Sequence, residues 1–318
     1  MRFLVNMLNH SPDGQRSLED VIGIFGQQLR ELGHEIAWDP KNTQWYPANE
    51  GINIMVEGFT DGSIFEIKRA YDQGCRFIYL ATEEPTPKGF NHGRDLEMVK
   101  RQAKFEEAAR YCEGIFYLVP GQHVHDWYNQ FKPAAYVELG HARVLRRPDP
   151  PARKFDFGFF GSLTPRRHRI LKMLAKVPLV VYVDSSFPDQ ATRDQRIQQC
   201  KVVLQLRKHA EMGLVSSSRC NTALNLGCAV LAEPHDQALS KPWDEIVRFS
   251  KYDPVTEPKA FAADAIMVKA AWRGVHLAQY EKFKTLLTPD YCVGRAFREI
   301  GFDLNNYDPG KLLQRTAA

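Results

Sequence analysis

The feature that most constrains the fold of this chain is a regular alternation of short apolar segments with longer amphipathic ones. In the first half, strands are expected at residues 2–8, 34–38, 52–56, 77–81 and 115–119, and helices at 17–32, 63–73 and 95–110. In the second half, strands are expected at 155–160, 179–183, 201–206, 229–232 and 246–249, and helices at 166–175, 189–199, 258–287 and 289–299. Such alternation is typical of parallel sheets built from right-handed βαβ units. The sequence therefore predicts an α/β protein.

A proline-rich basic segment separates the two halves. The chain has 318 residues, enough for two domains at about 150 residues each. The segment RVLRRPDPPARK at 143–154 carries three prolines, which cannot join the interior of a sheet. We expect a solvated interdomain connector here, with domains at 1–150 and 151–318. A nucleic-acid patch is the alternative reading of its basic residues, but no aromatic residues are interleaved with them.

The segment from Lys201 to Pro234 reads as strand, basic loop, helix and strand. Ser216, Ser217 and Ser218 are three consecutive candidates for the N-cap of the helix, which small and apolar residues then continue. A helix N-terminus offers unpaired N–H groups and partial positive charge, which suit a phosphate. Arg219 would add a bidentate guanidinium, and the preceding loop adds further cations at Arg207, Lys208 and His209. We expect a diphosphate-binding site at this helix start, although ordinary caps and solvated charges would give the same residues.

A second loop with phosphate-binding character follows the strand expected at 155–160. Gly161 would let backbone approach a ligand closely, and Ser162 could donate a hydrogen bond. Arg166 lies at the start of the next helix, where its charge and the helix N–H groups could meet phosphate. The position of this loop at the first strand of the second α/β unit favours a role in the same site.

Composition excludes several classes of protein. Apolar residues make up 44% of the chain, charged residues 25%, and the net charge is +4, which is too weak to indicate nucleic-acid binding. The six cysteines show no CxxC spacing and no histidine pattern typical of zinc, so we expect no metal site and no cofactor. No GxGxxG motif follows the first strand of either half, which argues against a dinucleotide oxidoreductase. No signal peptide or membrane-spanning run is recognised, so a cytoplasmic protein is expected.

The order of strand, basic loop, Ser/Arg helix start, Gly, strand and Glu resembles the donor-binding half of GT-B glycosyltransferases, including CgeB-like and capsule-type (group 1-like) enzymes. The resemblance implies two Rossmann-like, doubly wound domains facing across a cleft, with an acceptor-binding domain at 1–150 and a donor-binding domain with terminal helices at 151–318. It also implies that the serine-capped helix start and basic loop hold the pyrophosphate of a sugar nucleotide, and that Glu233 contacts the ribose or sugar. Retaining members often carry Glu where this chain has Leu214 and Thr222, which leaves the donor and the stereochemistry open.

The loops after the strands of the first half carry the catalytic candidates. Asp13 and His10 follow the first strand, from which GT-B enzymes often supply the base that deprotonates the acceptor, and Glu84 follows the strand at 77–81. A turn at Asp13-Gly14 and an extended solvated edge at Glu84-Pro85 are the structural alternatives. His123 and His125, at an expected helix start, are expected to be structural.

The predicted activity is transfer of a sugar from a nucleoside-diphosphate sugar to an acceptor hydroxyl without a metal, since no Asp-x-Asp motif is present. The acceptor could be a glycan, a lipid-linked group, a protein or a small molecule, and no nucleic acid is expected. A sugar-nucleotide 2-epimerase and a catalytically inactive nucleotide- or sugar-binding protein of the same fold remain alternatives. The predicted donor-binding residues are Gly161, Ser162, Arg166, Lys208, Ser217, Ser218, Arg219 and Glu233.

Overall fold

The structure is a computed structural model that describes residues 1–8, 12–38, 47–93, 96–150, 152–186, 188–208, 215–235 and 241–304, with the backbone alone at positions 12, 13, 15 and 17. Its contacts divide the chain into two compact units. Of the described residues, unit 1 contains 1–8, 29–138 and 289–304, and unit 2 contains 12–28 and 139–288. Helix α1 (Pro12–Glu31) therefore contributes to both units.

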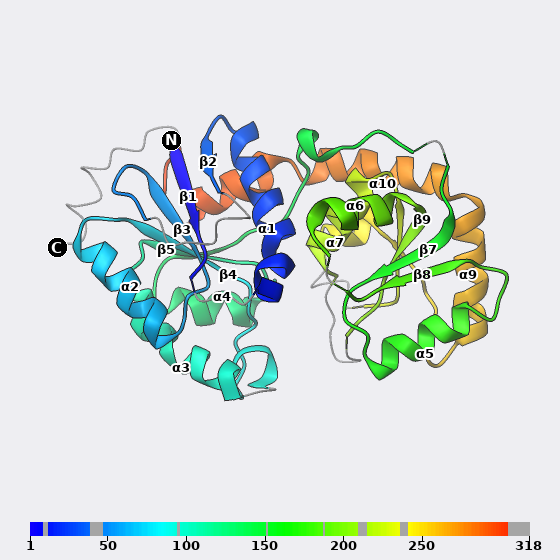
Figure 1. The fold of residues 1–318 in the computed structure, drawn as a ribbon, viewed down its shortest axis with the longest axis horizontal. Coiled ribbons are helices and arrows are strands. Elements are labelled where there is room, and N and C mark those ends of the chain that lie inside the picture. The colour runs from blue at the N-terminus through cyan, green and yellow to red at the C-terminus, as the bar shows by residue number, and fades with distance from the viewer. Residues whose placement is uncertain are drawn as a thin grey trace. The chain divides into compact units, whose positions relative to one another are not determined.

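Unit 1 is built on a parallel sheet with the strand order β2-β1-β3-β4-β5-β6 (Figure 1). The chain order reverses between β1 and β3. The strands are β1 (Arg2–Asn6), β2 (Glu35–Ala37), β3 (Ile52–Val56), β4 (Phe77–Ala81), β5 (Gly114–Tyr117) and β6 (Ala134–Tyr136). The helices are α2 (Asp61–Asp72), α3 (Leu96–Ala109), α4 (Gln122–Asn129) and α11 (Arg295–Glu299), with a 3-10 turn η1 (Phe90–Gly93) and a π-helical turn η3 (Asp290–Gly294).

Apolar side chains cover the sheet of unit 1 on both faces, as expected for buried parallel strands. On one face, the core joins β4 and β5 to α2, α3 and α4, with Phe105 of α3 fully buried in it. On the other face, Phe297 of α11 packs 5.3 Å from Phe3 and 4.7 Å from Phe116, measured between ring centroids. The C-terminal helix thus belongs to the core of the first unit.

Unit 2 is built on a second parallel sheet, with the order β11-β10-β9-β7-β8. Here the chain order reverses between β7 and β9. The strands are β7 (Phe155–Phe160), β8 (Val181–Asp184), β9 (Cys200–Gln205), β10 (Ala229–Ala232) and β11 (Arg248–Phe249). The helices are α5 (Pro165–Leu174), α6 (Gln190–Gln198), α7 (Ser217–Asn225), α8 (Trp243–Ile246), α9 (Pro258–Ala270) and α10 (Trp272–Leu286), with a 3-10 turn η2 (Arg143–Leu145).

Two parallel-sheet, Rossmann-like units confirm the predicted α/β class. In unit 2, β7, β9 and β10 form one core with α5 and α9, through side chains such as Phe157, Leu171 and Phe261. The strands expected at 155–160 and 229–232 have the predicted bounds. No helix in the described part of the chain combines the length and the apolarity that crossing a bilayer requires.

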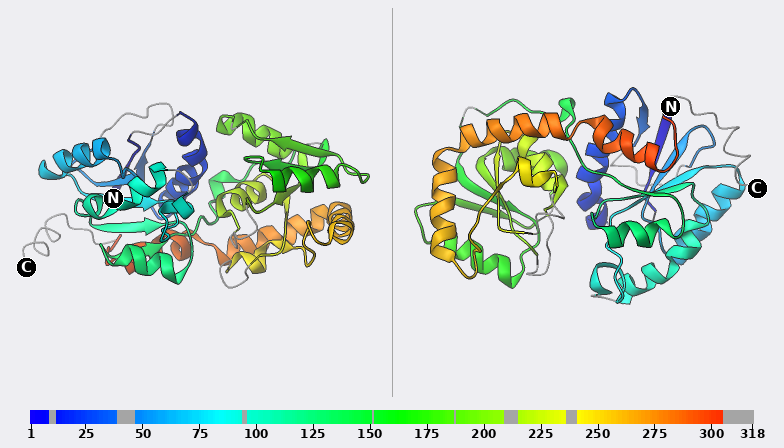
Figure 2. Two further views of the ribbon diagram at one scale, coloured as in Figure 1. Left: turned by 90° about the horizontal axis from the view of Figure 1, so that it is seen from below. Right: turned by 180° about the vertical axis from the view of Figure 1, so that it is seen from behind.

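The helix expected at 258–287 is instead two helices, which Figure 2 shows as two orange rods meeting at a corner. Ala271, between them, has φ −102° and ψ 14°, outside the α-helical range. The two helices contact the sheet in different ways on either side of this break. Phe261 and Val268 of α9 enter the sheet core, whereas Gln279 of α10 hydrogen-bonds both the N–H (2.9 Å) and the carbonyl (2.8 Å) of Val230.

The first loop and one strand also differ from expectation. The helix expected at 17–32 begins earlier, because α1 starts at Pro12, and proline is favoured at a first helical position. Strand β6 was not predicted, since Ala134–Tyr136 is short and follows Pro133 without an alternating pattern. The predicted domains 1–150 and 151–318 and the contact units differ at 12–28, 139–150 and 289–304.

The predicted solvated connector is wrong for Arg153. Only 3% of the Arg153 side chain is exposed, and its guanidinium donates to the carbonyl oxygens of Gln198 (3.0 Å), Cys200 (2.7 Å) and Leu226 (3.0 Å). The guanidinium also lies 5.0 Å from the ring centroid of Trp272. Because a buried guanidinium must have its N–H groups satisfied, this arginine ties the segment firmly to unit 2.

Candidate functional site

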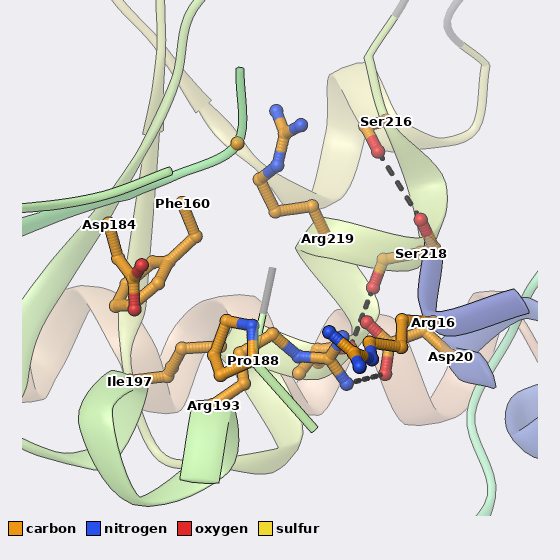
Figure 3. Close-up of a pocket in the computed structure, with 12 residues that line it drawn as sticks. Arg16, Asp20, Phe160, Asp184, Pro188, Arg193, Ile197, Ser216, Ser218 and Arg219 are labelled. Atoms are coloured by element: carbon orange, nitrogen blue, oxygen red, sulfur yellow. Dashed lines mark hydrogen bonds and ion pairs between the residues drawn. The ribbon is translucent and has the colours of Figure 1, made fainter. Parts of the chain in front are cut away.

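A pocket of about 130 Å³ lies in unit 2 at the carboxyl edge of its sheet (Figure 3). It sits at the point where the strand order reverses, between β7 and β9, which is where open α/β sheets bind ligands. Gly161 follows β7, Asp184 ends β8, and α7 begins after β9. The described residues lining the pocket are Arg16, Asp20, Phe160, Gly161, Asp184, Pro188, Arg193, Ile197, Ser216, Ser218, Arg219 and Thr222.

Gly161 and Arg219 lie against each other on one side of this pocket. Gly161 has φ +140°, a conformation that L side chains rarely adopt. A Cβ at this position would lie 3.1 Å from Nη2 of Arg219. Because Gly161 has no side chain, the Arg219 guanidinium can lie against its backbone.

The start of α7 forms another side of the pocket. The predicted serine cap is absent in its simple form, since Ser216 occupies the N-cap position but its side chain accepts no hydrogen bond from a backbone N–H of α7. The hydroxyls of Ser216 and Ser218 lie 3.3 Å apart instead. The hydroxyl of Thr222 donates to the carbonyl of Ser218 (2.9 Å). First-turn N–H groups that no side chain caps can bind an anion.

Arg219 is the most informative charge in the pocket. Its guanidinium donates to the neutral Oε1 of Gln205 (3.1 Å), and it forms no ion pair with any residue of the described ranges. Burial lowers the pKa of Arg219. Burial, reinforced by repulsion from Arg219, also lowers the pKa of the neighbouring Arg167 to about 10. Two guanidinium groups that repel each other and form no salt bridge with a carboxylate of the described residues favour binding of an anion.

An ion pair between α6 and α1 closes the pocket opposite Arg219. Arg193 donates from Nη2 to Oδ1 of Asp20, and Figure 3 shows the two side chains together beside Arg16. Burial raises the pKa of Asp20, although Arg193 acts in the opposite direction. Burial and the charge of Asp20 likewise raise the pKa of Asp194, next to Arg193, to about 6. Arg193 thus compensates the Asp20 carboxylate in this wall of the pocket.

Two predicted donor-binding residues, Arg166 and Glu233, lie in a separate buried network. Glu233 is 1% exposed, and its carboxylate accepts hydrogen bonds from Nη1 (2.8 Å) and Nη2 of Arg166. Nε of Arg207 lies 3.2 Å from the same carboxylate. Arg207 also pairs with Asp253 (2.9 Å). Both oxygens of the Glu233 carboxylate are therefore engaged within the protein.

The remaining predicted donor-binding residues have varied surroundings. Ser162 accepts hydrogen bonds from Nη1 of Arg167 at its carbonyl (3.0 Å) and its hydroxyl (3.3 Å). Lys208 has an exposed side chain, and its carbonyl accepts from Thr164 (3.2 Å). Ser217 is the first residue of α7 and is partly buried. Of the predicted set, the pocket thus brings together Gly161, Ser218 and Arg219.

The predicted catalytic residues belong to other parts of the chain. His10 lies outside the described residues, and only the backbone of Asp13 is described, in the first turn of α1. Glu84 follows β4 in unit 1, where its carboxylate lies 3.3 Å from Nε2 of His123 and 3.7 Å from Nε2 of His92. Their catalytic assignment stays a prediction.

Several pocket residues were missed by sequence reasoning. Asp184 could have been found from its position, because it directly follows the strand predicted at 179–183, and the carboxyl ends of parallel strands meet at one edge of the sheet. Asp20 and Arg193 offered none, since they lie 173 positions apart within two ordinary amphipathic helices. Among the residues that the structure describes, no group of three or more His, Cys, Asp or Glu side chains could hold a metal ion.

Comparisons with known proteins place this architecture. No family model matches the sequence. An uncharacterized protein, L140, of Acanthamoeba polyphaga mimivirus is 24% identical over 127 residues, which are 39% of this chain and 42% of that protein, so the chain matches less than half of its length.

Solved structures of glycosyltransferases match almost the whole chain. HepE of Anabaena, in complex with UDP and glucose, has 12% identity and a TM-score of 0.59 over 95% of this chain and 99% of that one. The DNA-modifying β-glucosyltransferase, studied with and without uridine diphosphoglucose, has 11% identity and a TM-score of 0.56 over 95% and 100%. Sucrose-phosphate synthase of Thermosynechococcus elongatus has 11% identity and a TM-score of 0.56 over 95% and 99%.

At these low identities the likeness concerns the fold. Each unit carries its own parallel sheet, and the match extends across both units in every one of these enzymes. The chain therefore has two Rossmann-like α/β domains of the kind found in GT-B glycosyltransferases.

Proposed function

We propose that this protein is a glycosyltransferase that moves a sugar from a nucleoside-diphosphate sugar to an acceptor hydroxyl. The observation that carries the proposal is Arg219, a partly buried guanidinium without a carboxylate partner in the described structure, set beside Gly161 and the start of α7. Support comes from the fold, because HepE and β-glucosyltransferase, which share it, are described with UDP or uridine diphosphoglucose.

The pocket would hold the diphosphate rather than a whole sugar nucleotide. Its volume of about 130 Å³ lies below the roughly 300–1,000 Å³ of sites that enclose a complete drug-sized ligand. A diphosphate bonded to Arg219 and the N–H groups of α7 would be stabilised most as it leaves, when its negative charge grows. Such stabilisation acts on the transition state and so accelerates transfer.

Other predicted donor-binding residues take supporting roles in this proposal. Arg166 and Glu233 would fix the polypeptide after β9 and β10 around the pocket, since their charges already satisfy each other. Ser162, Ser217 and Lys208 remain proposed contacts of the donor. Asp13, His10 and Glu84 remain proposed acceptor-side groups. Membership of the CgeB-like or capsule-type subgroup and a cytoplasmic location are likewise proposals.

The test measures binding and turnover separately. Calorimetry with UDP, GDP, ADP and dTDP at one fixed salt concentration identifies the base, and release of nucleoside diphosphate from the matching sugar nucleotides is followed with and without an acceptor panel. Arg219→Ala is expected to weaken diphosphate binding by about 1.5–3 kcal/mol, the range of a charged hydrogen bond, which is roughly 10- to 150-fold. Arg169→Ala, an exposed arginine on α5, serves as the control and should leave binding unchanged.

Each alternative gives a different result. Conversion of a sugar nucleotide to its epimer without an acceptor would identify a sugar-nucleotide 2-epimerase. Binding without any turnover would identify an inactive binding protein. Equal affinities of wild type and Arg219→Ala would remove the pocket from the proposal, and failure of every nucleotide to bind would refute the proposed function.

A further inference from the structure

Two largely buried arginines of unit 2 are compensated by carboxylates. Arg166 donates to both oxygens of Glu233, and Arg193 donates to Asp20. The two arginine side chains are 15% and 14% exposed. A carboxylate is the usual partner of a guanidinium removed from water, because a buried charge without compensation is costly. The charges of these two arginines are therefore satisfied within the protein.

Arg167 and Arg219 are held differently, by neutral oxygen atoms. Arg167 donates from Nε (3.1 Å) and Nη2 (2.7 Å) to the carbonyl of Leu206, and from Nη1 to Ser162. Arg219 donates from Nη1 to Oε1 of Gln205 (3.1 Å). Within the described ranges, neither guanidinium forms an ion pair with a carboxylate. The end of β9 thus holds two positive charges without neutralising them.

Gln205 is itself firmly fixed at the carboxyl end of β9. It is 5% exposed, its backbone pairs with Ala232 of β10, and its carbonyl accepts from the N–H of Glu233 (3.2 Å). Because a guanidinium only donates hydrogen bonds, the amide must turn Oε1 toward Arg219. Nε2 is then left without an acceptor among the residues that the structure describes. A buried donor without a partner destabilises the fold.

For stability alone, glutamate would be the better residue at position 205. It has the shape of glutamine, it would compensate the buried charge of Arg219, and it has no amide hydrogens that need an acceptor. The chain nevertheless carries the neutral residue, which leaves the Arg219 charge uncompensated in the wall of the pocket. Residues that sacrifice stability in this way are typical of functional sites.

We propose that Gln205 is a positioning residue, which holds Arg219 through a neutral oxygen so that the full positive charge stays available to the diphosphate; this deepens the proposed function and rests on it. The bond from Gln205 engages Nη1 of Arg219, whereas Nη2 lies beside Gly161, where a Cβ would be 3.1 Å away. A carboxylate at position 205 would compete with the diphosphate for the same guanidinium. The neutral amide avoids this competition, and the growing charge of the leaving group meets an uncompensated cation.

The test exchanges this one amide and measures binding together with stability. Gln205→Glu is expected to weaken binding of the nucleoside diphosphate by roughly 10- to 150-fold, the loss of a charged hydrogen bond, because the introduced carboxylate compensates Arg219. Its midpoint of urea unfolding should stay the same or rise. Gln205→Met keeps the charge of Arg219 available but removes its acceptor, so it should weaken binding by only about 2- to 10-fold and lower the midpoint.

Calorimetry with inorganic pyrophosphate and with UDP, GDP, ADP and dTDP measures the binding. Gln195→Glu is the matched control, because it adds the same charge at an exposed position of α6, and it should leave binding unchanged.

The outcomes separate the role of Gln205 from the proposed function. If the wild type transfers sugar and Gln205→Glu binds the diphosphate equally well, the role of Gln205 is wrong and the glycosyltransferase stands. Weaker binding by Gln205→Met than by Gln205→Glu, or a lower urea midpoint in Gln205→Glu, would mean a purely structural role and overturn the assignment. If the wild type binds neither pyrophosphate nor any of the nucleotides, both the assignment and the proposed function are refuted.

Discussion

Replacement of Arg101 by methionine tests a buried ion-pair network of unit 1, in which Arg101 of α3 donates to Glu83 (2.7 Å) and to Glu57. Methionine keeps much of the side-chain volume but leaves the carboxylates of Glu57 and Glu83 without their shared cation. Since breaking a buried ion pair by removing one partner costs about 3–5 kcal/mol, we expect a loss of that size in the opening free energy around α3 at pH 8.5. Such a loss speeds amide exchange by roughly a hundredfold or more.

The loss should depend on pH, because Glu83 can take up a proton. Burial first, and then repulsion from Glu57, raise the pKa of Glu83 to about 7. A carboxyl group whose folded pKa is raised binds extra protons in the folded state, so its contribution to stability falls as pH rises from its unfolded pKa through about 7. Without Arg101 this pKa rises further, and the penalty of the variant should be smaller at pH 5.5 than at pH 8.5.

Hydrogen exchange followed by mass spectrometry measures this effect locally. Peptides covering α3 should exchange faster in Arg101→Met, whereas peptides of α5 in unit 2 report the baseline. Arg110→Met is the matched control, because its ion pair with Glu106 spans 3.5 Å between side chains that are 66% and 70% exposed, and such pairs contribute little. Equal exchange in the two variants at pH 8.5, or a difference that does not vary with pH, would refute the reasoning.

Further predictions concern unit 2, with urea unfolding as the measurement. Thr164→Ala removes the N-cap of α5, which accepts from the N–H of Arg167 (3.3 Å), and should cost about 1 kcal/mol; an unchanged midpoint would show that this cap contributes nothing. Arg153→Met removes the guanidinium that donates to the carbonyls of Gln198, Cys200 and Leu226 and pairs with Asp149, so it should cost about 3–5 kcal/mol, and a loss below 1 kcal/mol would contradict the contacts described. Asp194→Asn should raise the free energy of unfolding, relative to wild type, more at pH 8 than at pH 5. Burial and Asp20 raise the pKa of Asp194 to about 6, so the folded state disfavours its charge above that pH. An effect of the substitution that does not vary with pH would be contrary evidence.

The fold could be predicted largely because buried parallel strands have a strong local signature. Phe155–Phe160 and Ala229–Ala232 are short apolar runs with glycine or a turn at their ends, and the structure confirms both bounds. The break at Ala271 could not be predicted, because alanine is a good helix former and gives no local signal of a helix end.

The candidate site likewise contains residues that could be predicted from the sequence and residues that could not. Gly161 and Arg219 stood out locally, since glycine after a strand and arginine at a helix start each suit phosphate. Glu233 did not reveal its partners, because its ion pairs with Arg166 and Arg207 join positions far apart in the chain. His123 was expected to be structural, and only the three-dimensional arrangement places Glu84 beside it.

The left-handed conformation of His92 has a consequence for how this protein varies between species. At φ +69° glycine would be the less strained residue, so selection for a stable turn alone would replace this histidine readily. Its imidazole lies 3.7 Å from Glu84. Relatives that keep an imidazole at this position despite the conformational cost would show that its chemistry is under selection, whereas relatives that drift to glycine or asparagine would show that only the bend of the chain is needed.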